Sequence, residues 1–127
     1  MKIKIDKADT LFSDFIRLRD GKCVKCGRLP SPREKDGAMV VGLECSHFWS
    51  RRHETTRFDP TNADALCFLC HHRWGGDDRE DYRDFKLKQL GAQRFDLLKV
   101  KAKSTGKKNR ALALVVVREL MKQLEGK

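Results

Sequence analysis

The sequence lacks a long apolar run, and this absence removes whole classes of protein. No stretch of the 127 residues approaches the roughly 18 apolar residues of a membrane-spanning helix, so we expect no membrane span. Residues 1–6 alternate charged and apolar side chains, with no apolar h-region, so we expect no secretory signal. Internal repeats are also lacking. These absences favour a single soluble domain over residues 1–127, located in the cytoplasm.

Acidic residues are too few to balance the basic ones. The chain has 28 Lys and Arg against 18 Asp and Glu, a formal net charge of +10, and 36% of its residues are charged. Hydrophobic residues still make up 39% of the chain, so it can bury a core and is not a disordered polycation. A basic folded domain most often binds a polyanion, and we expect nucleic acid. A generally basic, ribosomal type of surface is the alternative.

The five cysteines are an odd number, and without a secretory signal we do not expect disulfides. Four of them form two Cys-x-x-Cys pairs, Cys23/Cys26 and Cys67/Cys70. Two such turns together supply the four thiolates of a tetrahedral site, which Zn²⁺ prefers, so we predict a structural zinc. Redox dithiols and buried cysteines without a metal are the alternatives. Cys45 stands outside the pairs, and we expect a buried, inert thiol there.

Hydrophobic periodicity predicts a small α+β domain. The first half of the chain predicts a helix at 8–20 capped by Asp9 or Thr10, a strand at 38–43 continuing through 44–50, and an exposed basic loop at 51–60. An extended segment at 62–70 and a short helix from Cys70 or His71 follow. The remainder predicts helices at 78–90 and 92–100, a basic hinge at 99–110 and a helix at 111–124. These group into an N-terminal helical element (8–20), a metal-binding core (21–77), a helical region (78–100) and a basic linker with the last helix (101–127). The apolar face of the last helix packs on the body or forms a homodimer seam.

Histidines and one acid cluster around the second cysteine pair. Glu44 lies three residues before His47, and His71 follows Cys70 directly. A carboxylate and an imidazole can hold a catalytic divalent metal, and a further imidazole can take a proton from water. For His53 and His72 we expect ordinary surface histidines.

This order of residues resembles the HNH, or ββα-metal, nuclease superfamily. The shared pattern is a Cys-x-x-Cys pair, an acid and a histidine on a hairpin, an asparagine, and a second Cys-x-x-Cys followed by His or Asn. In this chain the pattern is met by Cys23/Cys26, Glu44, His47, Asn62, Cys67/Cys70 and His71.

The resemblance is closer to the NinG (Rap) family of phage recombination nucleases. Three matching stretches are Phe-Ile-Arg-Leu-Arg-Asp at 15–20, Glu-Cys-Ser-His-Phe at 44–48 and Arg-Phe-Asp-Pro-Thr-Asn at 57–62. The likeness covers about residues 11–99. The chain departs from the family at Glu44, Ser46 and His71, where the family has Asp, Gly and Asn.

The resemblance implies a ββα-metal core stapled by zinc and a DNA endonuclease activity, with branched or recombination DNA as substrate and a phage or prophage origin. It implies that Glu44 and His71 hold Mg²⁺ or Mn²⁺, that His47 is the general base, and that Asn62 braces the hairpin loop. Basic residues near these positions are candidates to bind the DNA backbone: Arg51, Arg52, Arg57, Arg73, Lys107, Lys108 and Arg110. Trp49 and Trp74 either stack on unpaired bases or pack in the core.

Three other functions compete with the endonuclease. A packaging-associated phage nickase would use the same chemistry. A non-catalytic, zinc-stapled nucleic-acid-binding module would keep the cysteines and the basic surface but lack a working metal pair. A redox protein would use the cysteine pairs directly, without stable zinc.

Overall fold

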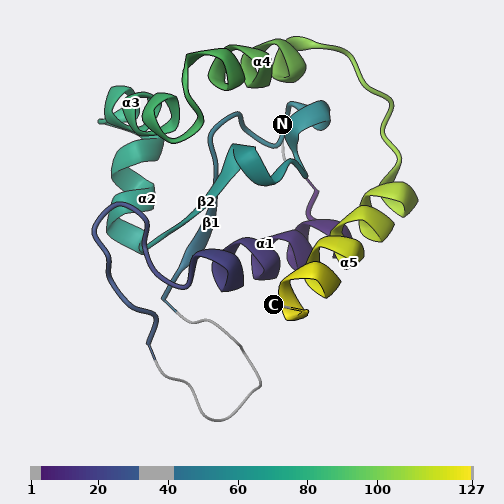
Figure 1. Ribbon diagram of the computed structural model, residues 1–127, viewed down its shortest axis with the longest axis horizontal. Coiled ribbons are helices and arrows are strands. Elements are labelled where there is room, and N and C mark those ends of the chain that lie inside the picture. The colour runs from purple at the N-terminus through teal and green to yellow at the C-terminus, as the bar shows by residue number, and fades with distance from the viewer. Residues whose placement is uncertain (1–3, 32–41, 127) are drawn as a thin grey trace.

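The computed structural model describes residues 4–31 and 42–126. In this part of the chain, five helices surround a two-stranded antiparallel sheet, which is the predicted small α+β class (Figure 1). The elements are α1 (Lys7–Asp20), β1 (Glu44–His47), the 3₁₀ turns η1 (Glu54–Thr56) and η2 (Pro60–Asn62), β2 (Ala63–Leu66), α2 (Phe68–Gly75), α3 (Arg79–Leu90), α4 (Ala92–Lys103) and α5 (Arg110–Glu125). No described helix has both the length and the apolar character that a bilayer span requires.

Helix α1 begins and ends where its sequence supplies caps. Asp6 accepts a hydrogen bond from the backbone of Asp9, and the Asp9 side chain accepts one from the backbone of Asp6, which forms a capping box. The cap is therefore Asp6, and not the predicted Asp9 or Thr10. Gly21 ends the helix in the left-handed conformation (φ +67°), which glycine adopts without strain.

The first described strand lies at 44–47, inside the stretch predicted to continue the strand at 38–43. The first four residues of the strand expected at 38–43 lie outside the described part of the chain. Gly42 and Leu43 precede β1 and do not belong to it. Strands β1 and β2 pair in register from Glu44 opposite Leu66 to His47 opposite Ala63. Because side chains alternate along a strand, Cys45 and His47 face one side of the sheet and Glu44 and Ser46 the other.

Helices cover both faces of this small sheet (Figure 1). On the first face, the ring of Phe12 in α1 lies 5.7 Å from the His47 ring. On the second face, Tyr82 of α3 donates a hydrogen bond to Asp64 of β2 at 2.8 Å. Arg19, at the end of α1, donates to the carbonyl oxygens of Pro60 and Ala63, both at 2.8 Å, and so fixes α1 along β2.

The segment at 51–60 is not the exposed loop that its charge predicted. It contains η1, and both Thr56 and Arg57 are buried. Arg57 donates to both carboxylate oxygens of Asp9, at 2.8 and 2.5 Å. Burial opposes ionisation of Asp9, but the hydrogen bond from Arg57 helps to hold the pKa of that carboxyl below its ordinary value. The loop is therefore part of the core, anchored to the first turns of α1.

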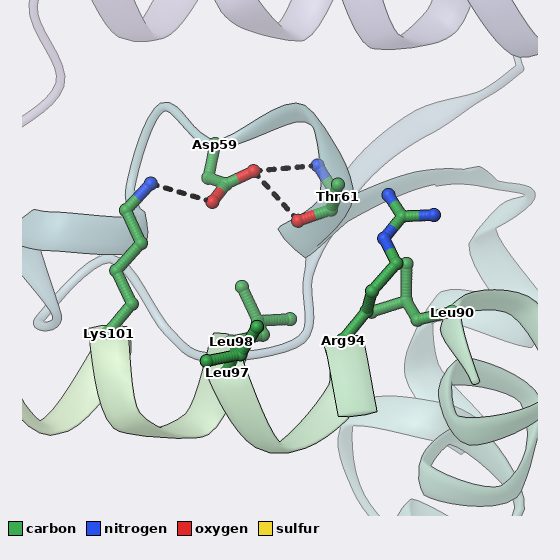
Figure 2. Close-up of a pocket in the computed structure, with 7 residues that line it drawn as sticks. All are labelled: Asp59, Thr61, Leu90, Arg94, Leu97, Leu98 and Lys101. Carbon is green, nitrogen blue, oxygen red and sulfur yellow. Dashed lines mark hydrogen bonds and ion pairs between the residues drawn. The ribbon is translucent and has the colours of Figure 1, made fainter. Parts of the chain in front are cut away.

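Helix α4 runs further than expected, to Lys103, because the apolar positions Phe95, Leu98 and Ala102 continue its buried face. Lys101 pairs with Asp59 at 2.9 Å, and Asp59 also accepts hydrogen bonds from Thr61, so α4 is tied to the turn before β2 (Figure 2). The basic hinge is reduced to the few residues between α4 and α5.

Helix α5 lies beside α1 (Figure 1), and Val117 is the residue it buries completely. Of the two predicted roles for α5, the structure shows packing against the rest of the domain. Leu112, Val115 and Val116 remain exposed on its other side.

A buried polar network joins β2 to α3. Lys86 and Asp64 are both fully buried and lie 2.9 Å apart. Burial lowers the pKa of Lys86, although the attraction of Asp64 acts in the opposite direction. Lys86 also donates to the carbonyl oxygen of Thr61 and to the side chain of Gln89, each at 2.7 Å. Each charge is thus compensated inside the core, which makes the pair sensitive to loss of either partner.

We expect Lys86→Met to destabilise the protein by about 3–5 kcal/mol, because it leaves the Asp64 carboxylate buried without its cation. Lys88→Met, at an exposed position of the same helix, is the matched control and should change stability by less than about 0.5 kcal/mol. Urea unfolding followed by circular dichroism measures both. Equal stabilities for the two variants would show that the pair is dispensable.

Candidate functional site

The two cysteine pairs meet in one cluster. The sulfur atoms of Cys23, Cys26, Cys67 and Cys70 all lie within 4.8 Å of one another, and those of Cys26 and Cys67 are 3.8 Å apart. In a tetrahedral zinc site with Zn–S bonds of about 2.3 Å, neighbouring sulfurs are roughly 3.8 Å apart. The donor set and its spacing therefore fit a structural metal such as zinc, as predicted.

Backbone hydrogen bonds shape the two turns that carry these thiols. Gly27 donates to the carbonyl oxygen of Cys23 at 2.8 Å, and the amide of Val24 donates to Ala65 of β2 at 3.0 Å. Burial opposes ionisation of Cys23, but hydrogen bonds from the backbone of Cys26 and Cys67 outweigh it and lower the pKa of the Cys23 thiol to about 7. One ligand is thus close to the thiolate form that a metal needs.

Cys45 is separate from this cluster. It is buried on the α1 side of the sheet, and burial raises the pKa of its thiol to about 12. A thiol that stays protonated at neutral pH is a poor nucleophile. The expected inert, buried role fits these surroundings.

Glu44 and His71 form a pair at the surface. The His71 Nδ1 atom lies 2.7 Å from the Glu44 Oε1 atom, and both side chains are partly exposed. The pairing follows from the fold, since Glu44 is opposite Leu66, directly before the cysteine turn, and His71 directly follows its last ligand. A shallow cleft opens beside the pair, lined by Glu44, Phe68, His71, His72, Gly75, Gly76 and Asp77.

Such a pair fits a divalent cation. Two ligands at right angles, each about 2.1 Å from an octahedral ion, are roughly 3 Å apart. A cation can therefore replace the proton that the pair shares with little movement of either side chain. Within the described residues no third carboxylate, histidine or cysteine joins them in a metal-sized cluster. Water or phosphate oxygens would complete the coordination, as is usual for Mg²⁺.

The structure does not bring His47 to this pair. Three residues along a strand separate Glu44 and His47 by about 10 Å and turn them to opposite faces. The His47 Nε2 atom lies 2.9 Å from the carbonyl oxygen of Arg57. A carbonyl only accepts hydrogen bonds, so Nε2 carries the proton and Nδ1 keeps a lone pair. Burial lowers the pKa of His47 to about 4, which keeps it neutral at pH 7.

Asn62 braces the loop between the strands, as the resemblance implies. Its Oδ1 atom accepts a hydrogen bond from the amide of Trp49 at 2.8 Å. Its Nδ2 atom donates to the carbonyl oxygens of Trp49 and Thr56, at 2.9 and 3.1 Å. The residue is fully buried, so it positions the loop and does not contact a substrate.

Two of the predicted DNA contacts are taken up inside the protein. Arg57 is buried against Asp9, as described above. Arg110 pairs with Asp6 at 3.0 Å and with Glu54 at 2.8 Å, which fastens the start of α5 to the body. Both arginines were predicted to bind DNA because they are basic. The sequence alone does not show that each has an acidic partner within the protein. Four of the predicted residues remain exposed: Arg52, Arg73, Lys107 and Lys108. Arg51 is partly buried.

The remaining aromatic and imidazole candidates divide in the same way. Trp74 is buried and stacks on Tyr82 with the ring centres 4.5 Å apart, so it belongs to the core. Trp49 is partly exposed and lies beside His53. The Nδ1 atom of His53 is hydrogen-bonded to the carbonyl oxygen of Ala102 at 3.0 Å. No motif in the sequence marks Asp77, yet it lines the cleft of Glu44 and His71 because α2 ends at the glycines before it.

The chain was compared with family models, curated proteins and solved structures, and none of them matches it. The site is therefore judged on its own geometry.

We expect the purified protein to hold one zinc ion per chain and to unfold when a strong chelator removes it, because the metal joins residues far apart in the sequence. Cys67→Ser should lose the zinc, whereas Cys45→Ala, which alters a cysteine outside the cluster, should keep it. Elemental analysis and circular dichroism measure both effects. A zinc-free protein with an unchanged spectrum would contradict the four-cysteine site.

We expect His47 to make stability depend on pH. Its pKa is lowered from 6.5 to about 4 in the folded protein, so below pH 6.5 the unfolded chain binds the extra proton. Stability should therefore fall as the pH drops from about 6.5 to 4, by up to about 3 kcal/mol for this group. His47→Gln should flatten this part of the profile, measured by urea unfolding at each pH. An unchanged slope would show that His47 is not the group responsible.

Proposed function

We propose that the protein is a metal-dependent DNA endonuclease of the HNH type, in which Glu44 and His71 hold the catalytic cation. The observation that carries the proposal is the 2.7 Å pairing of these two side chains at the edge of an open cleft. It joins one residue of the hairpin to one residue of the following helix. That placement is what a ββα-metal site requires.

The four-cysteine cluster supports the proposal by fixing where the pair can lie. Glu44 begins β1, and its partner on β2 is Leu66, next to the ligand Cys67. His71 is the residue after Cys70, and its amide donates to the carbonyl oxygen of Cys67 at 2.9 Å. A zinc bound there would hold both backbone positions, so that the cation site is organised before any substrate arrives.

Mg²⁺ or Mn²⁺ at this pair would supply the chemistry of phosphodiester hydrolysis, by neutralising phosphate charge and lowering the pKa of bound water. Glu44 would offer the cation a carboxylate oxygen, and His71 an imidazole nitrogen. Exposed Arg73 lies on the same short helix and is available to a phosphate of the DNA backbone. Arg52, Lys107 and Lys108 extend the basic surface elsewhere.

His47 retains the chemistry of a general base, with a neutral ring and an Nδ1 lone pair fixed by the Arg57 carbonyl. Its position on the other face of β1 separates it from the proposed cation. The proposed activity therefore rests on Glu44 and His71, which would hold the cation, and the His47 variant described below tests the role of His47.

A second function is favoured by that same separation. A zinc-stapled module that binds DNA without cutting it needs no general base, and it can use the Glu44–His71 contact simply as a hydrogen bond. The two functions share the fold, the zinc and the basic surface. They differ only in what Glu44 and His71 do.

We expect the protein to nick supercoiled plasmid or to cut a four-way DNA junction when Mg²⁺ or Mn²⁺ is added. Glu44→Gln and His71→Ala should each lower the cleavage rate by about a hundredfold or more, because each removes one cation ligand. Both should keep their zinc and their affinity for DNA. Glu119→Gln, at an exposed glutamate of α5, should cleave at the original rate. Gel electrophoresis of the products measures all four proteins.

The other outcomes separate the two functions. DNA binding without cleavage by the unaltered protein identifies the binding module. Cleavage that survives both Glu44→Gln and His71→Ala shows an active site elsewhere, and its loss in His47→Ala alone would place that site on the α1 side of the sheet.

A further inference from the structure

A second cleft lies next to the proposed cation site. It is lined by Phe48 and Phe95, which are both buried with their ring centres 5.8 Å apart, and by Trp49, whose side chain is partly exposed. Its volume of about 510 Å³ lies within the range of small-ligand sites. The loop after β1 and the helices α3 and α4 line this cleft.

Basic side chains make cation–π contacts with these rings. The guanidinium of Arg79 lies 4.3 Å from the centre of the Phe48 ring, and that of Arg83 lies 5.4 Å from the centre of the Phe95 ring. The ammonium of Lys103 lies 4.8 Å from the centre of the Trp49 ring. Lys99 adds a further positive charge at the rim. Aromatic faces combined with cations are the usual means of binding single-stranded nucleic acid.

The cleft also carries acceptors. Asp77, Glu80 and Asp96 line it, and they bring carboxylates to a cavity that is otherwise aromatic and basic. Carboxylates repel phosphate, but they accept hydrogen bonds from the exocyclic amino groups of nucleobases. The charges therefore suit a base inside the cleft and phosphates outside it, beside Lys99 and Lys103.

The position of the cleft ties it to the cation site. Asp77 lines both this cleft and the one beside Glu44 and His71, so the two adjoin. A strand whose phosphate reaches the cation can thus place a neighbouring base against Trp49. A fully paired duplex keeps its bases stacked inside the helix and has none to offer.

We propose that the cleft formed by Phe48, Trp49 and Phe95 takes an unpaired nucleobase next to the phosphate bound at Glu44 and His71. This inference rests on the proposed function, because it assumes DNA as the partner. It specifies one feature of the substrate: an unpaired base next to the bound phosphate, which a single-base bulge supplies. Trp49 provides the stacking face, and Lys103 moves from that face to the phosphate.

The test compares three duplexes of one length and sequence: fully paired, carrying a single unpaired adenine, and carrying an abasic residue in its place. Binding is measured by fluorescence anisotropy at one salt concentration without divalent cation. We expect the adenine bulge to bind about tenfold more tightly than either other duplex. Trp49→Ala should remove this advantage while leaving affinity for the paired duplex unchanged.

Charge-matched variants keep the test independent of folding defects. Arg83→Gln, at the cleft, should reduce the preference for the adenine bulge, whereas Arg118→Gln, at an exposed arginine of α5, should retain it. Equal affinities for the adenine and abasic bulges, or a preference that Arg83→Gln and Trp49→Ala both retain, would overturn this inference alone. An absence of binding to all three duplexes would overturn it together with the proposed function.

Discussion

The structure depends on the contact between two cysteine turns that lie far apart in the chain. The first turn follows α1, and the second joins β2 to α2, so a metal bound by all four thiolates connects the N-terminal helix, the hairpin and the next helix at one point. The sheet itself has only two short strands, and an isolated hairpin of that size is at best marginally stable in water. Binding of such a metal would therefore supply folding energy where the hydrogen bonds of the sheet are few.

The alternation of side chains along β1 divides the chemistry of the protein. The face toward α2 and α3 carries Glu44, which meets His71 beside the open cleft. The face toward α1 carries His47, which is neutral, oriented and mostly enclosed. In the sequence motif, Glu44 and His47 are expected to act at the same cation. The pleat of the strand places them about 10 Å apart and on different sides.

The features that the sequence predicted well are those with local causes. The helices follow from periodic apolar residues, and the end of α1 follows from Gly21. Each half of the cysteine cluster follows from a turn whose geometry is set within four residues. The bracing role implied for Asn62 also agrees with the structure, because its amide reaches only the nearby backbone of the same loop.

The features that the sequence did not reveal depend on distant partners. Arg57 and Arg110 were predicted to bind DNA, but they pair with acids of α1, its cap and η1, which no local pattern discloses. The same is true of the fully buried Lys86 and Asp64. The cleft of Phe48, Trp49 and Phe95 also escaped prediction, since it forms only where α3 and α4 pack against the loop after β1. The net charge of +10 thus overstates the basic surface that remains for a partner.

We propose that Glu44 and His71, and not His47, hold a divalent cation. The most direct measurement is the nuclear magnetic resonance spectrum of the histidine rings of the zinc-loaded protein during titration with Mn²⁺, whose paramagnetic broadening falls with the sixth power of distance. We expect the His71 ring signals to disappear at the lowest Mn²⁺ concentrations while those of His47 persist, and we expect Glu44→Gln to abolish the difference. Broadening of His47 before His71, or of neither ring, would contradict it.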